Sequence, residues 1–247
     1  MIYSDLHMHT HYCDGKNSPK EMVLSAIEKG LKTVGICAHA PMPFRADWCI
    51  REKNIKEFID EIKDLKEKYR GKINVLCGLE DDVYAVCDRS QFDYVIGSVH
   101  FFKVGEKYYP IDLSDKDLRL AVEEGFKGDA YAAAEQYFEN VVKVVKDATV
   151  VGHFDLITKF KDKDKLFDEN CSRYKKAWMA AVDKIIPLNI PFEINTGAIS
   201  RGHRTTPYPS FEMIEYIKEK GGKLVISSDS HNAQNVAFEF DKWKDLV

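Results

Sequence analysis

The stretch IYSDLHMHTHYCDG (residues 2–15) places a short β-rich run, residues 2–6, directly before His7, His9 and Asp14. Alternate residues of a strand point to the same side, so His7 and His9 can hold one ion between them. An HxH pair by itself is a weak signal. Its weight depends on whether the other strands of the chain end in the same kind of residue.

Short β-rich runs alternate with helical segments along the rest of the chain. The β-rich runs, including the first, are residues 2–6, 33–37, 73–77, 94–98, 149–152, 192–195 and 224–227. Helical periodicity predicts helices over residues 19–29, 55–69, 130–146, 172–186 and 211–220. The first helix has Ser18 as N-cap, Pro19 in the first turn and Glu21 as capping-box partner. Residues 101–129 are less regular.

This alternation predicts one α/β domain over residues 1–247, because no linker, internal repeat or low-complexity segment divides the chain. Alternating strands and helices form a parallel sheet with right-handed crossovers. Seven such units favour a closed or nearly closed barrel, and an open doubly wound sheet is the alternative.

Six of the seven predicted strands lead into residues that bind metals. These residues are His7, His9, Asp14, His39, Glu80, His100, His153, Asp229 and His231. In a parallel barrel the carboxyl ends of the strands meet on one face, where active sites lie. Neutral imidazole and carboxylate are the usual ligands of divalent first-row metals, and six of the eight histidines share this placement. The sequence therefore predicts a multinuclear metal site, with His11 and His203 outside the pattern.

The net charge and the cysteine content of the chain indicate which kinds of binding partner and which cellular compartment to expect. The formal net charge of −4, from 36 basic and 40 acidic residues, does not favour binding to long nucleic acids or to an anionic membrane. The six cysteines include no CxxC pair, which argues against disulfides and thiolate zinc sites and favours the cytoplasm. We expect no signal peptide, no membrane span and a small-molecule substrate. The oligomeric state is not readable.

Taken in order, the motifs resemble the PHP (polymerase and histidinol phosphatase) superfamily, and within it the stand-alone histidinol-phosphatase branch. The motifs are DLHMHT (5–10), CDG (13–15), CAHAP (37–41), CGLE (77–80), GSVHF (97–101), VGHFD (151–155), FEINT (192–196) and SSDSH (227–231). The resemblance covers nearly the whole chain and implies a distorted (β/α)7 TIM-like barrel that holds three divalent metal ions. Zinc, iron and manganese all suit histidine and carboxylate ligands, so the metal is not identified.

The resemblance also implies a place for each ligand. His7 and His9 would hold the first ion with Asp229, and Glu80 would bridge it to a second ion. The other ligands of the second ion would be His100 and His153, and those of the third would be Asp14, His39 and His231.

A polar loop, TGAISRGHRTTPYPS (196–210), follows the one predicted strand that supplies no metal ligand. Its similarity to the phosphate-binding stretch of the family implies that Arg201 and Arg204 contact the substrate phosphate, since a guanidinium matches phosphate oxygens in a fork. Lys159 is a third candidate.

These features predict hydrolysis of a phosphate monoester, with L-histidinol phosphate, an intermediate of histidine biosynthesis, as the preferred substrate. Water activated by the metals would attack phosphorus in line, so no serine or cysteine nucleophile is required. Glu80 and Asp229 are the expected catalytic carboxylates, and the leaving alkoxide would take its proton from water at the metals or from Asp229. The substrate imidazole is expected near loop aromatics such as Phe44, Trp48 or Phe101.

Three other readings are possible. A PHP-family phosphodiesterase or exonuclease acting on nucleotides would use the same metal site. An amidohydrolase also begins with HxH on a first strand but needs a lysine at the end of a middle strand, and Lys103 lies outside the strand. A non-catalytic metal-binding module does not explain so complete a set of exchangeable ligands.

Overall fold

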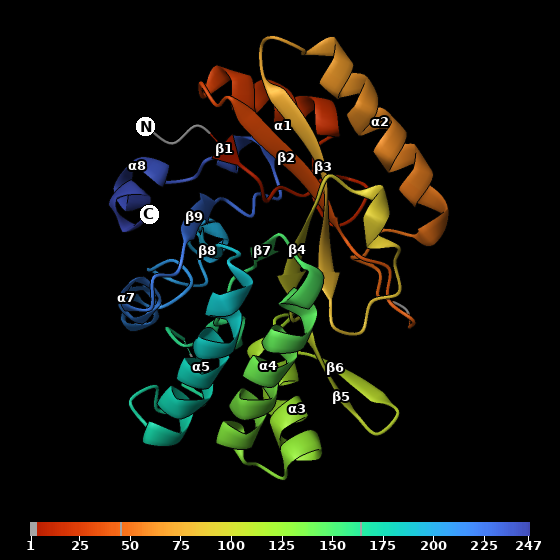
Figure 1. Ribbon diagram of the computed structural model, residues 1–247. Helices are drawn as coiled ribbons and strands as arrows, with labels where there is room; N and C mark the ends of the chain where they lie inside the picture. Colours follow the sequence, from red (N-terminus) through yellow and green to blue (C-terminus); the bar gives the residue numbers. More distant parts are fainter. Residues whose placement is uncertain (1–3, 45, 164) are drawn as a thin grey trace.

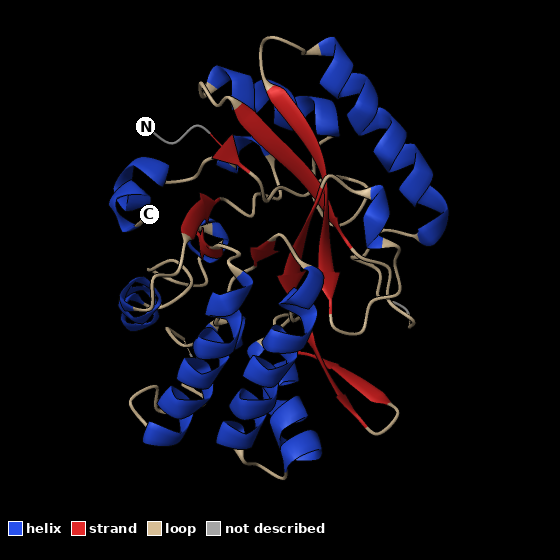
Figure 2. Ribbon diagram, in the orientation of Figure 1, coloured by secondary structure: helices blue, strands red, loops and turns tan. Residues whose placement is uncertain are grey.

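The centre of the molecule is a seven-stranded sheet in the computed structural model, which describes residues 4–44, 46–163 and 165–247. In spatial order its strands are β1 (Ser4–Asp5), β2 (Thr33–His39), β3 (Asn74–Asp82), β4 (Tyr94–Ser98), β7 (Val150–Val151), β8 (Phe192–Asn195) and β9 (Leu224–Ser227). Each pairing between neighbours in this order is parallel. An antiparallel hairpin, β5 (Phe101–Val104) and β6 (Lys107–Pro110), projects from the sheet (Figure 2).

Helices surround the sheet (Figure 1). Near β2 and β3 lie α1 (Pro19–Glu28) and α2 (Ile55–Lys68), whereas α4 (Ala130–Val144) and α5 (Ser172–Ile185) pack against each other. The other helices are α3 (Asp115–Phe126), α6 (Gly197–Ser200), α7 (Phe211–Glu219) and α8 (Phe240–Trp243). Within the described ranges, every helix is too short or too polar to cross a bilayer.

The first and last strands meet just beyond their carboxyl ends, which nearly closes the barrel. A parallel bridge pairs Met8 with Ser230. The amide of His9 donates to the Ser230 carbonyl at 2.8 Å, and the amide of Ser230 donates to the His7 carbonyl at 3.2 Å. The predicted (β/α)7 barrel is confirmed, and the open doubly wound sheet is wrong. All seven strands therefore point their carboxyl ends at one mouth.

Most element predictions are confirmed to within a few residues. The runs at 94–98, 192–195 and 224–227 match β4, β8 and β9, and the predicted capping box is present, with the Glu21 amide 3.3 Å from the Ser18 hydroxyl. β3 extends five residues past the predicted end, to Asp82, so that Glu80 lies within the strand. Residues 2 and 3 of the first predicted run lie outside the described residues. The β5–β6 hairpin and α3 occupy the segment 101–129, which showed no usable period.

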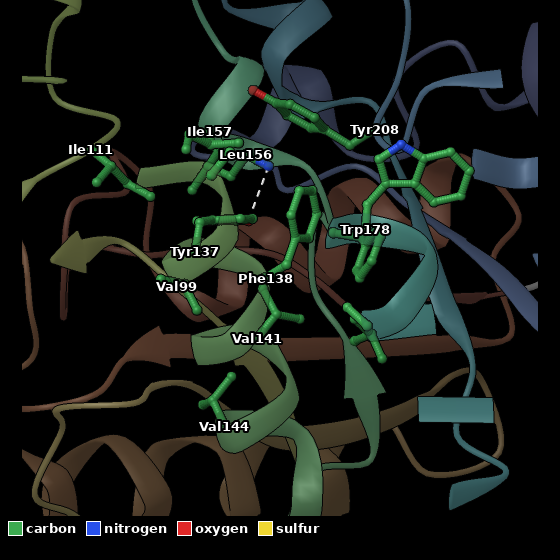
Figure 3. Close-up of a cluster of buried hydrophobic side chains, with 14 of the residues drawn as sticks. Val99, Ile111, Tyr137, Phe138, Val141, Val144, Leu156, Ile157, Trp178 and Tyr208 are labelled. Atoms are coloured by element: carbon green, nitrogen blue, oxygen red, sulfur yellow. Dashed lines mark hydrogen bonds between the residues drawn. The ribbon is translucent and has the colours of Figure 1, made fainter. Parts of the chain in front are cut away.

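The larger of the two main apolar clusters packs α4 and α5 against the sheet (Figure 3). It includes Tyr137, Phe138 and Trp178, all buried. The Tyr137 hydroxyl accepts a hydrogen bond from the Leu156 amide at 3.1 Å, drawn as a dashed line in Figure 3. This bond fixes the start of the short 3₁₀ helix η4 (Leu156–Thr158), which follows β7 and precedes Lys159.

Candidate metal centre

The nine predicted ligands converge at the mouth of the barrel. His39 ends β2 and Glu80 lies in β3, while the others follow β1, β4, β7 and β9 or lie in the turn that contains Asp14. Seven of the nine are buried, with Asp14 and His231 the more accessible pair. Three groups of described side chains bring potential ligand atoms within 4.8 Å of one another, and they overlap at His9 and His39.

The deepest group surrounds one carboxylate oxygen of Glu80. Its Oε2 lies 3.3 Å from His7 Nε2 and 3.2 Å from His9 Nε2, and these two nitrogens are 3.1 Å apart. Asp229 Oδ1 lies 3.7 Å from His7 Nε2 and 3.5 Å from His9 Nε2. Four atoms held about 2.0–2.1 Å from a tetrahedral ion are about 3.3 Å from one another, so the spacing suits an ion.

The other oxygen of Glu80 faces a second pair of histidines. Oε1 lies 2.8 Å from His153 Nε2 and 3.3 Å from His100 Nε2. A carboxylate with one oxygen toward each group has the geometry to bridge two ions.

A third group lies nearer the surface. Asp14 Oδ2 is 3.1 Å from His231 Nε2, and its Oδ1 is 3.6 Å from His39 Nε2 and 4.0 Å from His9 Nδ1. The His9 ring stacks on that of His39 with centroids 4.2 Å apart. His9 therefore connects this outer group to the deep one.

The two buried carboxylates at the mouth of the barrel, Glu80 and Asp229, need a compensating positive charge. Burial alone would raise the pKa of Glu80, but His39, His7 and His100 hold it well below its ordinary value. Burial would also raise the pKa of Asp229. Arg201 and the neighbouring histidines outweigh this effect, so the pKa of Asp229 is far below its ordinary value. Both carboxylates are therefore ionised inside the protein, where an unpaired charge is costly.

Unpartnered polar atoms point to the same conclusion. His153 Nδ1 is buried without a hydrogen-bond partner among the described residues. Glu80 Oε2 and His39 Nδ1 lie 2.8 Å apart, but neither has a partner in hydrogen-bond geometry within the same part of the chain. Orphaned buried polar atoms are rare in proteins and indicate a missing ion or water. The donor set of imidazoles and carboxylates suits divalent metals, so the residues present fit a metal centre. Cys37 lies beside His7 and His9, but burial raises its pKa well above normal, so it remains a neutral thiol.

Glu193 on β8 is a functional residue that was missed from the sequence, although it stands in the FEINT motif. Its side chain is fully buried, and its Oε1 accepts from His7 Nδ1 at 2.7 Å. Its Oε2 accepts from the His153 amide and from Asn195 Nδ2, both at 2.9 Å. A carboxylate on the outer nitrogen of a histidine fixes the tautomer that presents the other nitrogen to a metal. An acidic residue inside an apolar strand was the available signal.

Two glycines allow the backbone to pack this closely. A Cβ on Gly15 would lie 2.4 Å from the His9 carbonyl carbon, which explains the glycine after Asp14. A Cβ on Gly197 would lie 2.7 Å from Asp229 Oδ2. Asp229 itself has φ of 48°, a left-handed conformation that aspartate tolerates better than most residues.

A cavity of about 220 Å³ opens beside the ligand groups. Lys159, Arg201 and His203 bring basic groups to its wall, and Trp48 contributes an aromatic face. Arg201 Nη2 contacts Asp229 Oδ2 at 2.9 Å, and its Nη1 donates to the Asp229 carbonyl at 2.8 Å. Arg201 and Lys159 therefore present their cationic groups in the same cavity as several of the metal-type ligands.

Arg204 has a different environment from the one expected. Its guanidinium is fully buried, lies 4.2 Å from the Tyr208 ring centroid and donates to Thr158 Oγ1 at 2.8 Å. It also faces Asp155 Oδ2 at 3.5 Å. These partners hold Arg204 outside the cavity lining, so the structure does not bring it together with the other two candidates for phosphate binding, Arg201 and Lys159. In this position it joins the segment before Lys159 to the loop that carries Arg201.

The loop aromatics contact one another, and of the three only Trp48 lines the cavity. The rings of Trp48 and Phe101 are parallel with centroids 5.4 Å apart, and Phe44 contacts Phe101 at 4.8 Å. Trp48 lines the cavity, whereas Phe101 is buried behind it. His11 is exposed and lies against Tyr12, outside the ligand groups.

Comparison with known families agrees with the geometry. The model of the PHP domain family matches residues 5–197, which include most of the ligands. The histidinol-phosphatase of Bacillus subtilis is 26% identical over 263 residues, covering 96% of this chain and 96% of that protein. The histidinol-phosphatase of Lactococcus lactis is 27% identical over 257 residues, covering 98% of this chain and 89% of that protein.

Solved structures share the fold. A structural genomics target from Listeria monocytogenes has a TM-score of 0.79 at 21% identity, covering 97% of this chain and 99% of that one. The histidinol phosphate phosphatase of Lactococcus lactis, solved with zinc, L-histidinol and phosphate, has a TM-score of 0.75 at 22% identity, covering 99% of this chain and 92% of that one.

Proposed function

Since the chain belongs to the PHP domain family, we propose that it is a metal-dependent phosphatase that hydrolyses L-histidinol phosphate to L-histidinol and inorganic phosphate. One observation carries the proposal: a buried set of metal-type ligands shares a cavity with Lys159 and Arg201. The relatives named histidinol-phosphatase match nearly the whole chain, which supports the substrate. We further propose that residues 1–247 act as one domain, in the cytoplasm, as part of histidine biosynthesis.

The metal centre of this proposal contains three divalent ions. His7, His9 and Asp229 would hold the first, and Glu80 would bridge it to the second. The remaining ligands would be His100 and His153 for the second ion, and Asp14, His39 and His231 for the third. Zinc is supported by its presence in the Lactococcus lactis protein, and iron or manganese would suit the same ligands.

When bound, the ions would supply Lewis-acid activation of water and of the phosphoryl oxygens. Arg201 and Lys159 would hold the non-bridging oxygens and neutralise charge that develops on the transferring group. Asp229 would bind the first ion through Oδ1, which faces His7 and His9, while Arg201 holds its Oδ2. The ester P–O bond breaks as the new P–O bond to the water oxygen forms, and the proton that this water releases passes to the leaving alkoxide.

His203 is not the source of that proton at neutral pH. Burial and the nearby Lys159 and Arg201 lower the pKa of His203 to about 4. Its imidazole is therefore neutral in the cavity and can serve as a hydrogen-bonding wall residue.

The proposal is tested by a substrate panel on the metal-replete protein. We expect a clear preference in kcat/KM for L-histidinol phosphate over 4-nitrophenyl phosphate and over nucleotide diesters. Preference for a diester would favour the alternative, a PHP-family phosphodiesterase. Absence of hydrolysis with full metal content would favour a non-catalytic metal-binding module.

A further inference from the structure

Asp112 is a carboxylate in the cavity wall that the metal centre does not use. Three carboxylates line the cavity, and the other two, Asp14 and Asp229, belong to the proposed ligand set. Asp112 follows β6, in the excursion between β4 and α4 that sequence periodicity did not resolve. The amide of its neighbour Ile111 donates to the His100 carbonyl at 2.9 Å, which fixes the loop beside the metal site.

Lys159 is the partner of Asp112 in the structure. Lys159 Nζ donates to the Asp112 carbonyl at 2.7 Å and to Asp112 Oδ2 at 3.2 Å. Both side chains are largely buried, with 21% of Asp112 and 11% of Lys159 exposed. Within the described residues, the hydrogen bonds from Lys159 go to the carbonyl and Oδ2 of Asp112, which leaves Oδ1 for another donor. Burial alone would raise the pKa of Asp112, but its ion pair with Lys159 opposes this effect and favours the ionised carboxylate.

A carboxylate at this place is unfavourable for binding a simple phosphate monoester. It would repel a dianionic group bound beside it, and it competes with phosphate for the Lys159 ammonium. The cost is removed if the substrate itself brings a positive charge to Asp112, because opposite charges in a partly buried site attract strongly.

We propose that Asp112 determines specificity by binding a cationic group, of the primary ammonium class, that the phosphomonoester carries close to its phosphate. The inference rests on the proposed function and goes further by naming the residue and the charge that it selects. On this assignment the phosphate lies toward Arg201 and Lys159, and the ammonium lies against Asp112 Oδ1. The rest of the substrate, which in L-histidinol phosphate includes the imidazole ring, lies along Trp48 and Leu113, which line the same cavity.

The competing explanation is that Asp112 only orients Lys159. The two roles differ in what they do to substrates without a cation. An orienting role lowers activity toward every phosphomonoester equally, whereas a selecting role affects only substrates that carry the ammonium.

The test compares Asp112→Asn and Lys159→Ala with the unaltered enzyme in the metal-loaded state. One substrate pair is L-histidinol phosphate and 3-(imidazol-4-yl)propyl phosphate, which lacks the amino group. The other pair is 2-aminoethyl phosphate and ethyl phosphate. Asparagine keeps the size and the hydrogen-bonding oxygen of aspartate, and Asp115→Asn, in the first turn of α3, is the matched control. Inhibition by L-histidinol and by inorganic phosphate gives a binding readout, and elemental analysis verifies metal content.

We expect Asp112→Asn to lower kcat/KM for the ammonium-bearing substrates roughly 10- to 100-fold, the range for a lost charge-assisted hydrogen bond. The two substrates without an ammonium should change less than about threefold. Inhibition by L-histidinol should weaken while inhibition by phosphate is kept. Lys159→Ala should weaken all four substrates and phosphate together.

An equal loss for all four substrates in Asp112→Asn would overturn the inference and leave Asp112 as a positioning residue for Lys159. Unchanged kinetics would overturn it as well. The simple aminoethyl pair keeps this outcome separate from the proposed function. If the unaltered enzyme does not favour L-histidinol phosphate, the proposed substrate is wrong, yet selection for an ammonium is still measured.

Discussion

Replacing Glu193 by glutamine tests whether the metal centre depends on a carboxylate that binds no metal. Glu193 accepts three hydrogen bonds, from His7 Nδ1 at 2.7 Å, from the His153 amide at 2.9 Å and from Asn195 Nδ2 at 2.9 Å. A glutamine side chain has the same shape but only one acceptor oxygen, and its other terminal group is a donor.

Neither orientation of the new amide satisfies these partners. With its oxygen toward His7, the NH2 group meets the donors of His153 and Asn195. With its NH2 group toward His7, that ring must carry its proton on Nε2, the atom that faces Glu80 and Asp229. The second arrangement blocks the metal-binding nitrogen of His7, and the first leaves two buried donors without acceptors.

The size of the effect follows from these contacts. Loss of an outer hydrogen-bond partner of a ligand histidine weakens metal binding by about 10- to 100-fold, or about 1.4–2.8 kcal/mol. Two unsatisfied buried donors cost about 1–3 kcal/mol each, so the free energy of unfolding of the metal-free protein should fall by roughly 2–6 kcal/mol. Glu193→Asp keeps the charge and should retain part of the affinity.

The assay is a competition titration of zinc against a chromophoric chelator, with denaturant unfolding of the metal-free protein beside it. The matched control is Glu135→Gln, because Glu135 is a 40%-exposed partner of Arg173. This surface change should alter stability by less than about 1 kcal/mol and leave zinc affinity unchanged. If folded Glu193→Gln binds zinc with unaltered affinity and stoichiometry, the reasoning about the His7 tautomer is wrong.

Four further results are expected. Chelation should abolish activity, and Glu80→Ala should remove at least two ions by elemental analysis with the fold kept by circular dichroism; activity in protein with only trace metal would contradict this. Arg201→Ala should lower kcat/KM by an amount equivalent to roughly 1.5–3 kcal/mol of transition-state stabilisation and should weaken inhibition by phosphate. Arg201→Lys should recover only part of this loss, and unchanged values in Arg201→Ala would rule out phosphate contact. Arg204→Ala should lower the free energy of unfolding by about 3–5 kcal/mol, because it leaves Asp155 buried without its cation, and a loss below 1 kcal/mol would argue against the buried pair. His203 has a folded pKa of about 4 against 6.5 unfolded, so its contribution to stability is present above pH 6.5 and is lost as the pH falls toward 4. In His203→Gln the midpoint of thermal unfolding should therefore depend less on pH between 6.5 and 4. An unchanged pH dependence would contradict the lowered pKa.

The sequence alone determined the barrel and the identity of most of the candidate site. The grouping of His7, His39 and Asp229 could be predicted because each follows or ends a strand, and the alternation of β and α segments brings the carboxyl ends of all strands to one face. One ligand-type residue at one strand end is weak evidence for a metal site. The same placement at six of the seven predicted strands made the prediction specific. The predicted strand at 224–227 and the capping box at Ser18 depend on short-range patterns, and both are present in the structure.

Tertiary structure alone decided which polar side chains reach the cavity. Arg201 and Arg204 are three residues apart in the same polar loop, yet one lines the cavity and the other is buried against Asp155. The roles of Glu193, inside the FEINT motif, and of Asp112 could not be read from the sequence, because they arise from partners distant in sequence, His7 and Lys159. Periodicity reports which face of an element is buried, whereas the partner of a buried charge is fixed only when separate segments pack together.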